Sequence, residues 1–165
     1  MLLYGMRQGS PWELLRWMLK EEYGFEALPE IQREAKGKPF FPNLPRLHFS
    51  LSDSGDYALC ALSAAPVGVD IERIRPRREN LPRFALSEKE YARFCGEGGD
   101  WSLFYTLWTR REAWCKYTGR GLGDSWGQDT PTGLFFASYG GETWRAAVCG
   151  EEPPPEKIIW LEELP

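Results

Sequence analysis

The sequence predicts an α+β domain, and three observations lead to this prediction. Two segments with helical spacing of apolar residues begin at capping boxes, residues 10–13 and 87–90. Strand-like runs joined by short turns follow one another between residues 47 and 74, which favours antiparallel pairing. The chain has 165 residues, of which 42% are hydrophobic, so it can bury one sizeable core. We therefore expect one domain, or two small halves that share a core.

Residues 1–74 are expected to contain one helix and four strands. Residues 2–6 form a short strand, and a helix then begins at Pro11, inside the first capping box, and ends at Gly24. Residues 29–46 contain four prolines and are expected to be an irregular connection. The remaining strands, with a turn at residues 53–56, are expected at residues 47–52, 57–63 and 67–74.

Residues 75–165 are expected to contain two helices and three strands. One helix begins at the second capping box and ends near Gly96. The longest helix begins near Asp100 and ends at Gly119, a residue type that commonly stops a helix. Its apolar stripe consists of Phe104, Leu107, Trp108 and Cys115. The strand-like runs are residues 133–138, 143–148 and 157–161.

Charge and composition exclude some classes of function. A net charge of −4 argues against a generally basic nucleic-acid-binding protein. Within eleven residues, however, five arginines occur: Arg73, Arg75, Arg77, Arg78 and Arg83. Such a cluster suits an acidic partner or a phosphate, and it equally suits a solvated loop, so both interpretations stay open.

The cysteines and the hydropathy pattern indicate a cytosolic protein. The four cysteines lie far apart without a C-x-x-C pair, so we expect neither zinc binding nor a disulfide framework. No run of eighteen apolar residues occurs, and the first residues do not resemble a signal peptide. We expect no membrane association and no nucleic-acid partner.

The strongest chemical signal is the pair Asp70 and Glu72. These residues alternate with Val69 and Ile71, so on a strand both carboxylates face one way and both apolar side chains face the other. Two like charges side by side are unfavourable in isolation. The pair therefore indicates a bound cation or basic partners.

Glu112 and Lys116 add a third carboxylate and an ammonium group. They lie four residues apart on the longest predicted helix, hence on one face, with Glu112 at the rim of the apolar stripe. Three carboxylates and a lysine suit a magnesium-dependent reaction at a phosphate. A plainer interpretation is an exposed strand face and an ordinary helix ion pair, worth about 0.2 to 0.5 kcal/mol.

Several stretches, taken in order and spacing, closely resemble the 4'-phosphopantetheinyl transferase superfamily, in its surfactin-type subgroup. The stretches are Gly37-Lys38-Pro39, residues 47–55, the carboxylate strand, Trp108-x-x-Arg111-Glu112-x-x-x-Lys116 and residues 119–122. The resemblance implies a magnesium-dependent enzyme that transfers 4'-phosphopantetheine from coenzyme A to a serine of an acyl, peptidyl or aryl carrier protein. The second product is 3',5'-ADP.

The family resemblance also implies a fold and a set of site residues. The fold has two similar α+β halves about a pseudo-two-fold axis, here approximately residues 1–66, which are abbreviated, and 67–165. Coenzyme A lies in the cleft between them. The implied magnesium ligands are Asp70, Glu72 and Glu112. The implied coenzyme contacts are Lys38, Ser52, Asp53 and Lys116.

The resemblance further assigns catalytic roles. Glu112, or a water held by the carboxylates, would take the serine proton, and Lys116 would neutralise charge on the pyrophosphate. His48 is expected to be structural.

Two features depart from the family pattern. The family usually has Ser-His-Ser where this chain has Ser52-Asp53-Ser54, and an aspartate repels a phosphate. The family also generally has a further helix and loop where this chain has only residues 7–9. Two other interpretations therefore stay open: a non-catalytic relative that binds a carrier or nucleotide as an accessory factor, and another magnesium-dependent phosphotransfer enzyme. The choice between monomer and homodimer is also open.

Overall fold

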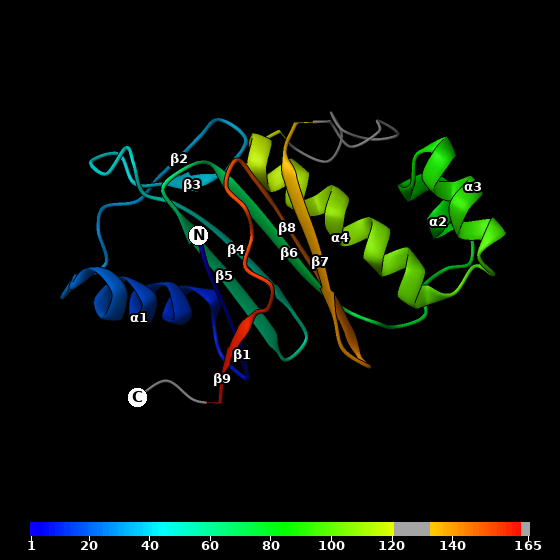
Figure 1. The fold of residues 1–165 in the computed structure, drawn as a ribbon, viewed down its shortest axis with the longest axis horizontal. Coiled ribbons are helices and arrows are strands. Elements are labelled where there is room, and N and C mark those ends of the chain that lie inside the picture. Colours follow the sequence, from blue (N-terminus) through cyan, green and yellow to red (C-terminus); the bar gives the residue numbers. More distant parts are fainter. Residues whose placement is uncertain (121–132, 163–165) are drawn as a thin grey trace.

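The computed structural model describes residues 1–120 and 133–162, which form two larger β-sheets and one two-stranded sheet, with helices packed outside the larger sheets (Figure 1). The first sheet has the order β4-β5-β1-β9 and contains β1 (Leu2–Arg7), β4 (His48–Ser54), β5 (Tyr57–Ser63) and β9 (Ile159–Leu161). The second sheet has the order β6-β8-β7 and contains β6 (Val67–Arg73), β7 (Phe135–Gly140) and β8 (Trp144–Gly150). The helices are α1 (Pro11–Tyr23), α2 (Leu81–Ala85), α3 (Glu88–Gly96) and α4 (Trp101–Thr118).

The predicted helix boundaries are confirmed. At the start of α1, the Ser10 hydroxyl and the Glu13 carboxylate form the predicted capping box, and Gly24 ends the helix in the left-handed conformation, with φ of 71°. A second capping box starts α3, as predicted. Asp100 caps the first turn of α4, whose Leu103 amide donates to the Asp100 carboxylate, and Gly119 follows its last turn.

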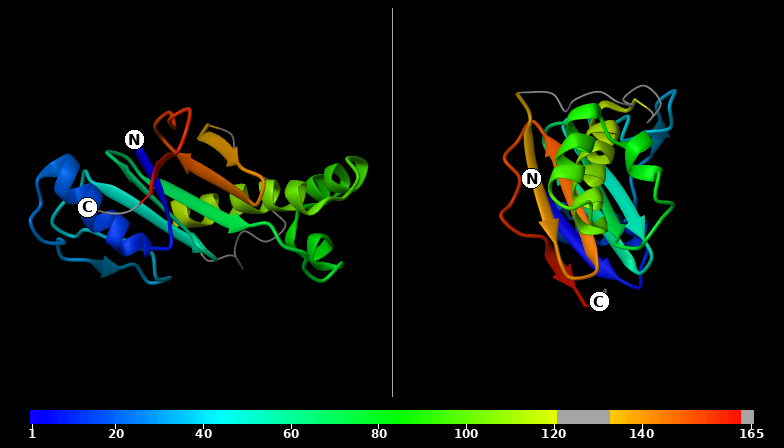
Figure 2. Two further views of the ribbon diagram at one scale, coloured as in Figure 1. Left: turned by 90° about the horizontal axis from the view of Figure 1, so that it is seen from below. Right: turned by 90° about the vertical axis from the view of Figure 1, so that its right-hand side faces the viewer.

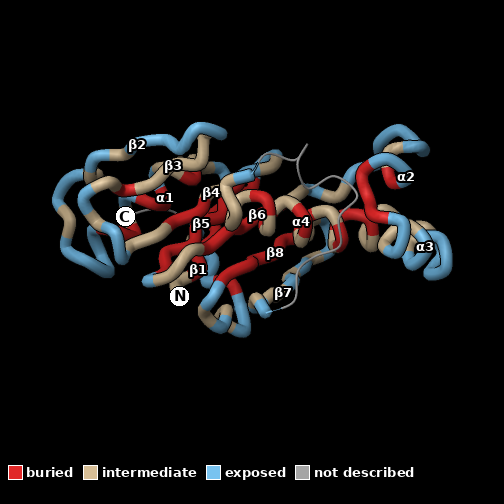
Figure 3. Tube along the Cα trace, turned by 90° about the horizontal axis from the view of Figure 1, so that it is seen from above, coloured by how far each residue is buried: buried red, intermediate tan, exposed pale blue. Residues whose placement is uncertain are grey.

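Strand β5 lies at the centre of the molecule and is buried on both faces. Its residues Ala58, Cys60 and Leu62 face the core beneath α1, whereas Leu59 and Ala61 face the second sheet. Figure 3 shows the buried segments concentrated along these central strands. The molecule is therefore layered as α1, first sheet, second sheet and α4.

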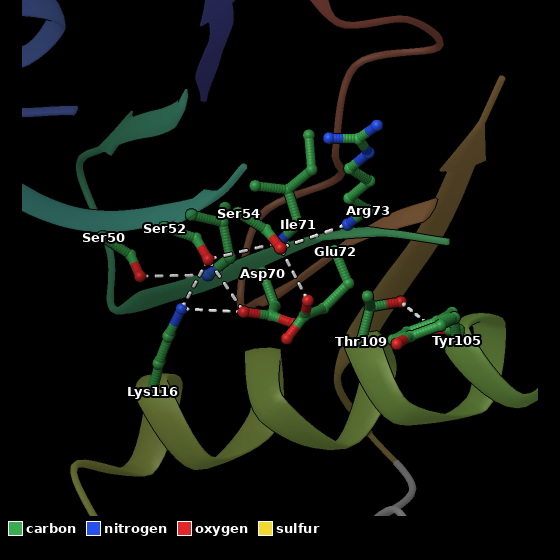
Figure 4. A network of polar contacts seen from close by, with 11 residues as sticks. Ser50, Ser52, Ser54, Asp70, Ile71, Glu72, Arg73, Tyr105, Thr109 and Lys116 are labelled. Carbon is green, nitrogen blue, oxygen red and sulfur yellow. Dashed lines mark hydrogen bonds and ion pairs between the residues drawn. The ribbon is translucent and has the colours of Figure 1, made fainter. Parts of the chain in front are cut away.

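The second sheet brings the carboxylates to α4. Val69 and Ile71 pack against the first sheet, so Asp70 and Glu72 point the opposite way, toward the helix (Figure 4). Gly68 allows the close approach, because a Cβ there would lie 2.0 Å from the Ala113 carbonyl oxygen of α4. The strand alternation predicted for this segment is thus confirmed, and α4 is the element that the carboxylates face.

The structure corrects the predicted sheet. Strands β4 and β5 pair as predicted, but β6 does not continue their sheet and instead pairs with β8. On the side of β6 that faces β4, the amides of Val69, Ile71 and Arg73 donate to serine hydroxyls rather than to backbone carbonyls, so the edges of the two sheets meet through side chains. Strand pairing over a long sequence separation is decided by tertiary packing, which local pattern does not report.

Local assignments also differ at three places. Strand β4 continues to Ser54, so Asp53 lies in the strand, and the tight turn is Gly55 and Asp56. The connection expected to be irregular contains the small hairpin of β2 (Gln32–Arg33) and β3 (Pro39–Phe40). Helix α2 was not expected, because its five residues are too few for a helical period to be visible.

Helices α2 and α3 pack on the N-terminal half of α4, at the end of the molecule opposite to α1 (Figure 2). Aromatic side chains fill this contact, including Phe94, Phe104 and Tyr105. The fully buried Arg111 pairs with Glu90 of α3, so this side of α4 is covered as well as the predicted stripe. Within the described ranges, no helix combines the length and apolar character needed to cross a membrane.

Candidate active site

Asp70 lies at the centre of the candidate site and is nearly inaccessible, with 5% of its surface exposed. Its Oδ1 atom accepts hydrogen bonds of 2.8 Å from Lys116 Nζ of α4 and from the Ser52 hydroxyl of β4. Its Oδ2 atom is buried without a hydrogen-bond partner. Burial raises the pKa of Asp70 and the charge of Glu72 adds to this, whereas Lys116 and Ser52 oppose it.

Glu72 lies one strand alternation further along β6, beside Asp70 (Figure 4). Its Oε2 atom accepts a hydrogen bond of 2.7 Å from the Ser54 hydroxyl. The two carboxylates predicted to share a face therefore do so, and each is held by a serine of β4.

Glu112 lies on α4, half-buried and one helical turn before Lys116, and both residues line the same cavity. Burial raises its pKa to about 7, and the negative charges of Asp70 and Glu72 contribute in the same direction. Lys116, one turn further along the helix, opposes the shift. The pKa shift indicates that the charges of these three carboxylates influence one another, and their convergence on one metal site stays a prediction.

These residues fit a divalent cation. Three carboxylates face one ammonium group, so the site carries excess negative charge, and the unpartnered Asp70 Oδ2 is an oxygen of the kind that hard cations prefer. Within the described residues, however, no three His, Cys, Asp or Glu side chains already form a ligand group. Asp70, Glu72 and Glu112 as magnesium ligands therefore stay a prediction.

A cavity of about 360 Å³ adjoins this site on the side of β4 and α1. Trp12 and Phe49, in edge-to-face contact at 6.1 Å, form part of its wall. Acidic Asp53 and Glu112 also line it. Its basic lining residues are Arg33, Lys36, Lys38, Lys116 and Arg120. A cavity with this excess of positive charge suits a polyanion with an aromatic group.

Several of these lining residues were not predicted from the sequence. Arg33 reaches the cavity because the β2-β3 hairpin folds back, and its guanidinium donates to the Gly37 carbonyl at 2.8 Å. Trp12 enters from the first turn of α1. The only local signal was the basic Lys36-Gly37-Lys38 turn, since the other contacts come from segments far apart in the chain.

The predicted coenzyme contacts occupy different positions in this structure. Lys38 lines the cavity, and its ammonium group donates to the Tyr117 carbonyl at the end of α4 at 2.5 Å. Asp53 is exposed and also lines the cavity. The hydroxyl of Ser52 is buried, donates to Asp70, and accepts from Lys116 and from the Ile71 amide. Because these three bonds use its full capacity, a contact between Ser52 and coenzyme A would require one of them to break.

The arginine-rich segment lies beside the N-terminal half of α4. The Tyr105 hydroxyl of α4 donates to the Arg75 carbonyl at 3.1 Å and accepts from Arg77 Nε at 3.2 Å. The side chains of Arg75 and Arg78 are exposed, as is Phe84 of α2, at 60%. The predicted stretch at residues 119–122 continues beyond Arg120, outside the described residues.

Known proteins match the part of the chain that carries the site. Residues 66–149, from just before β6 to near the end of β8, match the model of the 4'-phosphopantetheinyl transferase superfamily. The chain is 32% identical over 160 residues to a 4'-phosphopantetheinyl transferase of Bacillus subtilis, covering 85% of this chain and 71% of that protein. It is 31% identical over 174 residues to 4'-phosphopantetheinyl transferase Sfp of Bacillus subtilis strain 168, covering 92% of this chain and 78% of that protein.

A protein of Salmonella typhimurium supplies a further match. The chain is 34% identical over 159 residues to 4'-phosphopantetheinyl transferase AcpT of Salmonella typhimurium, covering 90% of this chain and 80% of that protein. Since the family model spans all four residues of the carboxylate and lysine site, and the relatives align over most of both chains, this chain belongs to the 4'-phosphopantetheinyl transferase superfamily.

Proposed function

We propose that this transferase moves 4'-phosphopantetheine from coenzyme A to a serine of an acyl, peptidyl or aryl carrier protein, with magnesium, and releases 3',5'-ADP. The observation that carries this proposal is the adjacency of two features. A carboxylate site with an unpartnered buried oxygen at Asp70 opens beside a cavity lined by five basic residues. The first feature suits a divalent cation and the second suits the phosphates of coenzyme A.

The coenzyme would occupy the basic cavity. Lys38, Arg33 and Arg120 would face its phosphates, and the Trp12 and Phe49 wall would contact an aromatic ring. Asp53 lines the same cavity and would oppose a phosphate placed next to it. Coenzyme binding would thus depend on the surrounding basic residues more than on the Ser52-Asp53-Ser54 segment.

The magnesium ligands would be Asp70, Glu72 and Glu112. A bound magnesium ion would supply neutralisation of the pyrophosphate charge. Lys116 now pairs with Asp70, and it would exchange this partner for the pyrophosphate once a cation compensates Asp70.

The transfer itself is a displacement at phosphorus. The carrier serine oxygen would attack the phosphorus that bears the pantetheine arm, and the bond from that phosphorus to the bridging oxygen would break. The 3',5'-ADP would leave with the bridging oxygen. Glu112, or a water held by the carboxylates, would accept the serine proton.

The carrier would dock beside the N-terminal half of α4. Exposed Arg75 and Arg78 would contact acidic side chains of the carrier, and exposed Phe84 would supply an apolar contact with the carrier.

We also propose that the two halves of the family fold correspond to residues 1–66 and 67–165, with the first abbreviated. The cytoplasmic location inferred from the cysteines stays a prediction.

Mass spectrometry of an apo carrier protein tests this function. After incubation with coenzyme A, magnesium and this protein, we expect the carrier to gain the mass of one phosphopantetheine group. Glu112→Gln should abolish this gain in mass because the change removes the negative charge. The change preserves the side-chain volume, so the fold should be retained. Glu142→Gln, at an exposed position, is the matched control. Carrier binding without any mass gain would instead favour a non-catalytic accessory role.

A further inference from the structure

The edges of the two sheets are joined by a row of serines that we call the serine seam: Ser50, Ser52 and Ser54 of β4. Alternation along β4 directs all three side chains toward β6, and both Ser50 and Asp53 also line the cavity. The three hydroxyls accept hydrogen bonds from the amides of Val69, Ile71 and Arg73 at 3.0, 3.2 and 3.2 Å. Each hydroxyl thus takes the place of a backbone carbonyl in a strand ladder.

The three serines differ in what they donate to. Ser52 donates to Asp70 Oδ1 at 2.8 Å, and Ser54 donates to Glu72 Oε2 at 2.7 Å (Figure 4). Ser50 accepts the Val69 amide in the same way, yet within the described ranges its hydroxyl donates to no carboxylate. The seam therefore contains two members that reach the carboxylates and one that does not.

The bonding pattern sets the direction of each hydroxyl proton. An amide of β6 occupies a lone pair of the serine oxygen, so the O–H bond is directed away from that amide and toward the carboxylate. One oxygen of Asp70 is held in this way and its other oxygen, Oδ2, has no partner. A serine hydroxyl fixes the carboxylate without adding a positive charge of its own, although Asp70 Oδ1 also accepts from Lys116.

We infer that Ser52 and Ser54 are positioning residues that orient Asp70 and Glu72 for cation binding. This inference rests on the proposed magnesium site. It also explains why the seam is built from hydroxyls, since a backbone carbonyl could accept the β6 amide but could not donate to a carboxylate. Ser54 is the better test position, because it is only partly buried whereas Ser52 is buried and also contacts Lys116.

The test is the affinity of the metal alone, measured by calorimetric titration of the full chain with Mn²⁺, which accepts the same oxygen ligands as magnesium. We expect Ser54→Ala to raise the Kd for Mn²⁺ about tenfold or more, the range typical for loss of a hydrogen bond to a metal-binding side chain. Ser50→Ala loses an equivalent amide bond and should stay within about twofold of the parent. Ser54→Thr, which keeps the hydroxyl, should bind like the parent.

The outcomes separate the two proposals. If the parent binds Mn²⁺ and Ser54→Ala binds it equally well, the positioning role is wrong while the metal site stands. Equal weakening by Ser50→Ala and Ser54→Ala would show a general structural effect of the seam and would also overturn the inference. If the parent and Glu112→Gln alike bind no Mn²⁺, the proposed metal site fails, and the inference fails with it. Circular dichroism of each variant checks that the fold is retained.

Discussion

Lys116 and Asp70 form an ion pair of 2.8 Å between α4 and β6, and this pair leaves the second oxygen of Asp70 buried without a partner. The pair is asymmetric, because the side chain of Lys116 is 33% exposed and the side chain of Asp70 only 7%. In the absence of a cation, the stability of the buried carboxylate therefore depends on Lys116.

Removing Lys116 should destabilise the metal-free protein. We expect Lys116→Met to lower the free energy of unfolding in EDTA by about 1 to 2 kcal/mol, less than for a fully buried pair because Lys116 is partly solvated. Magnesium should recover part of this loss if it binds the carboxylates. Urea unfolding with EDTA and with magnesium measures both effects, and Lys116→Arg serves as the charge-retaining control. Equal stability of Lys116→Met and the parent in EDTA would contradict this prediction.

The raised pKa of Glu112 predicts a pH dependence of stability. Its pKa is 4.5 in an ordinary environment and about 7 in the folded protein, so the folded state retains a proton that the unfolded state loses first. The contribution of protonated Glu112 to the free energy of unfolding is fully present below about pH 4.5. It is lost as the pH rises through about 7.

In EDTA, the parent should therefore lose about 1 to 2 kcal/mol relative to Glu112→Gln across this pH range, after allowance for solvent screening of a half-buried group. Thermal unfolding of the two proteins between pH 4.5 and 8 measures the difference. Parallel stability curves for the parent and the variant would contradict the assigned pKa.

The exposed arginines predict a salt-dependent interaction with an acidic carrier. Replacing Arg75 and Arg78 by glutamine should raise the apparent KM for the carrier about three- to tenfold at low salt and flatten its salt dependence. Arg77 is left in place because it donates to Tyr105. The control, Arg16→Gln with Lys20→Gln on α1, makes the same change in net charge at the opposite end of the molecule. An equal rise in KM for both double variants would show a non-local charge effect instead.

Replacement of Asp53 is expected to increase the affinity for coenzyme A. It is exposed in the basic cavity, so Asp53→His should remove a repulsion and add a donor near the coenzyme. Solvent should reduce the effect to roughly 1 kcal/mol, or about fivefold in Kd. Calorimetric titration with coenzyme A and with dephospho-coenzyme A, which lacks the 3'-phosphate, measures it. A gain for both ligands, or for neither, would mean that this phosphate lies away from Asp53.

The sequence was most informative where a short segment carries its own signal. The capping boxes at residues 10–13 and 87–90 begin the predicted helices, because the bonds that form them lie within one turn. The alternation of residues 69–72 correctly separates the carboxylate face of β6 from its apolar face. The family was likewise predicted correctly, since the residues that mark it occur in this sequence in the expected order and spacing.

The sequence by itself determined the ends of α1, α3 and α4, the face of β6 that carries Asp70 and Glu72, and the family. The tertiary structure alone decided that β6 leaves the first sheet, that Lys116 pairs with Asp70, and that Arg33 reaches the cavity. It also decided that serines of β4 hold the carboxylates. The physical reason is range: a cap or an alternation depends on neighbours within a few residues, whereas an ion pair or a strand edge depends on which distant segments pack together.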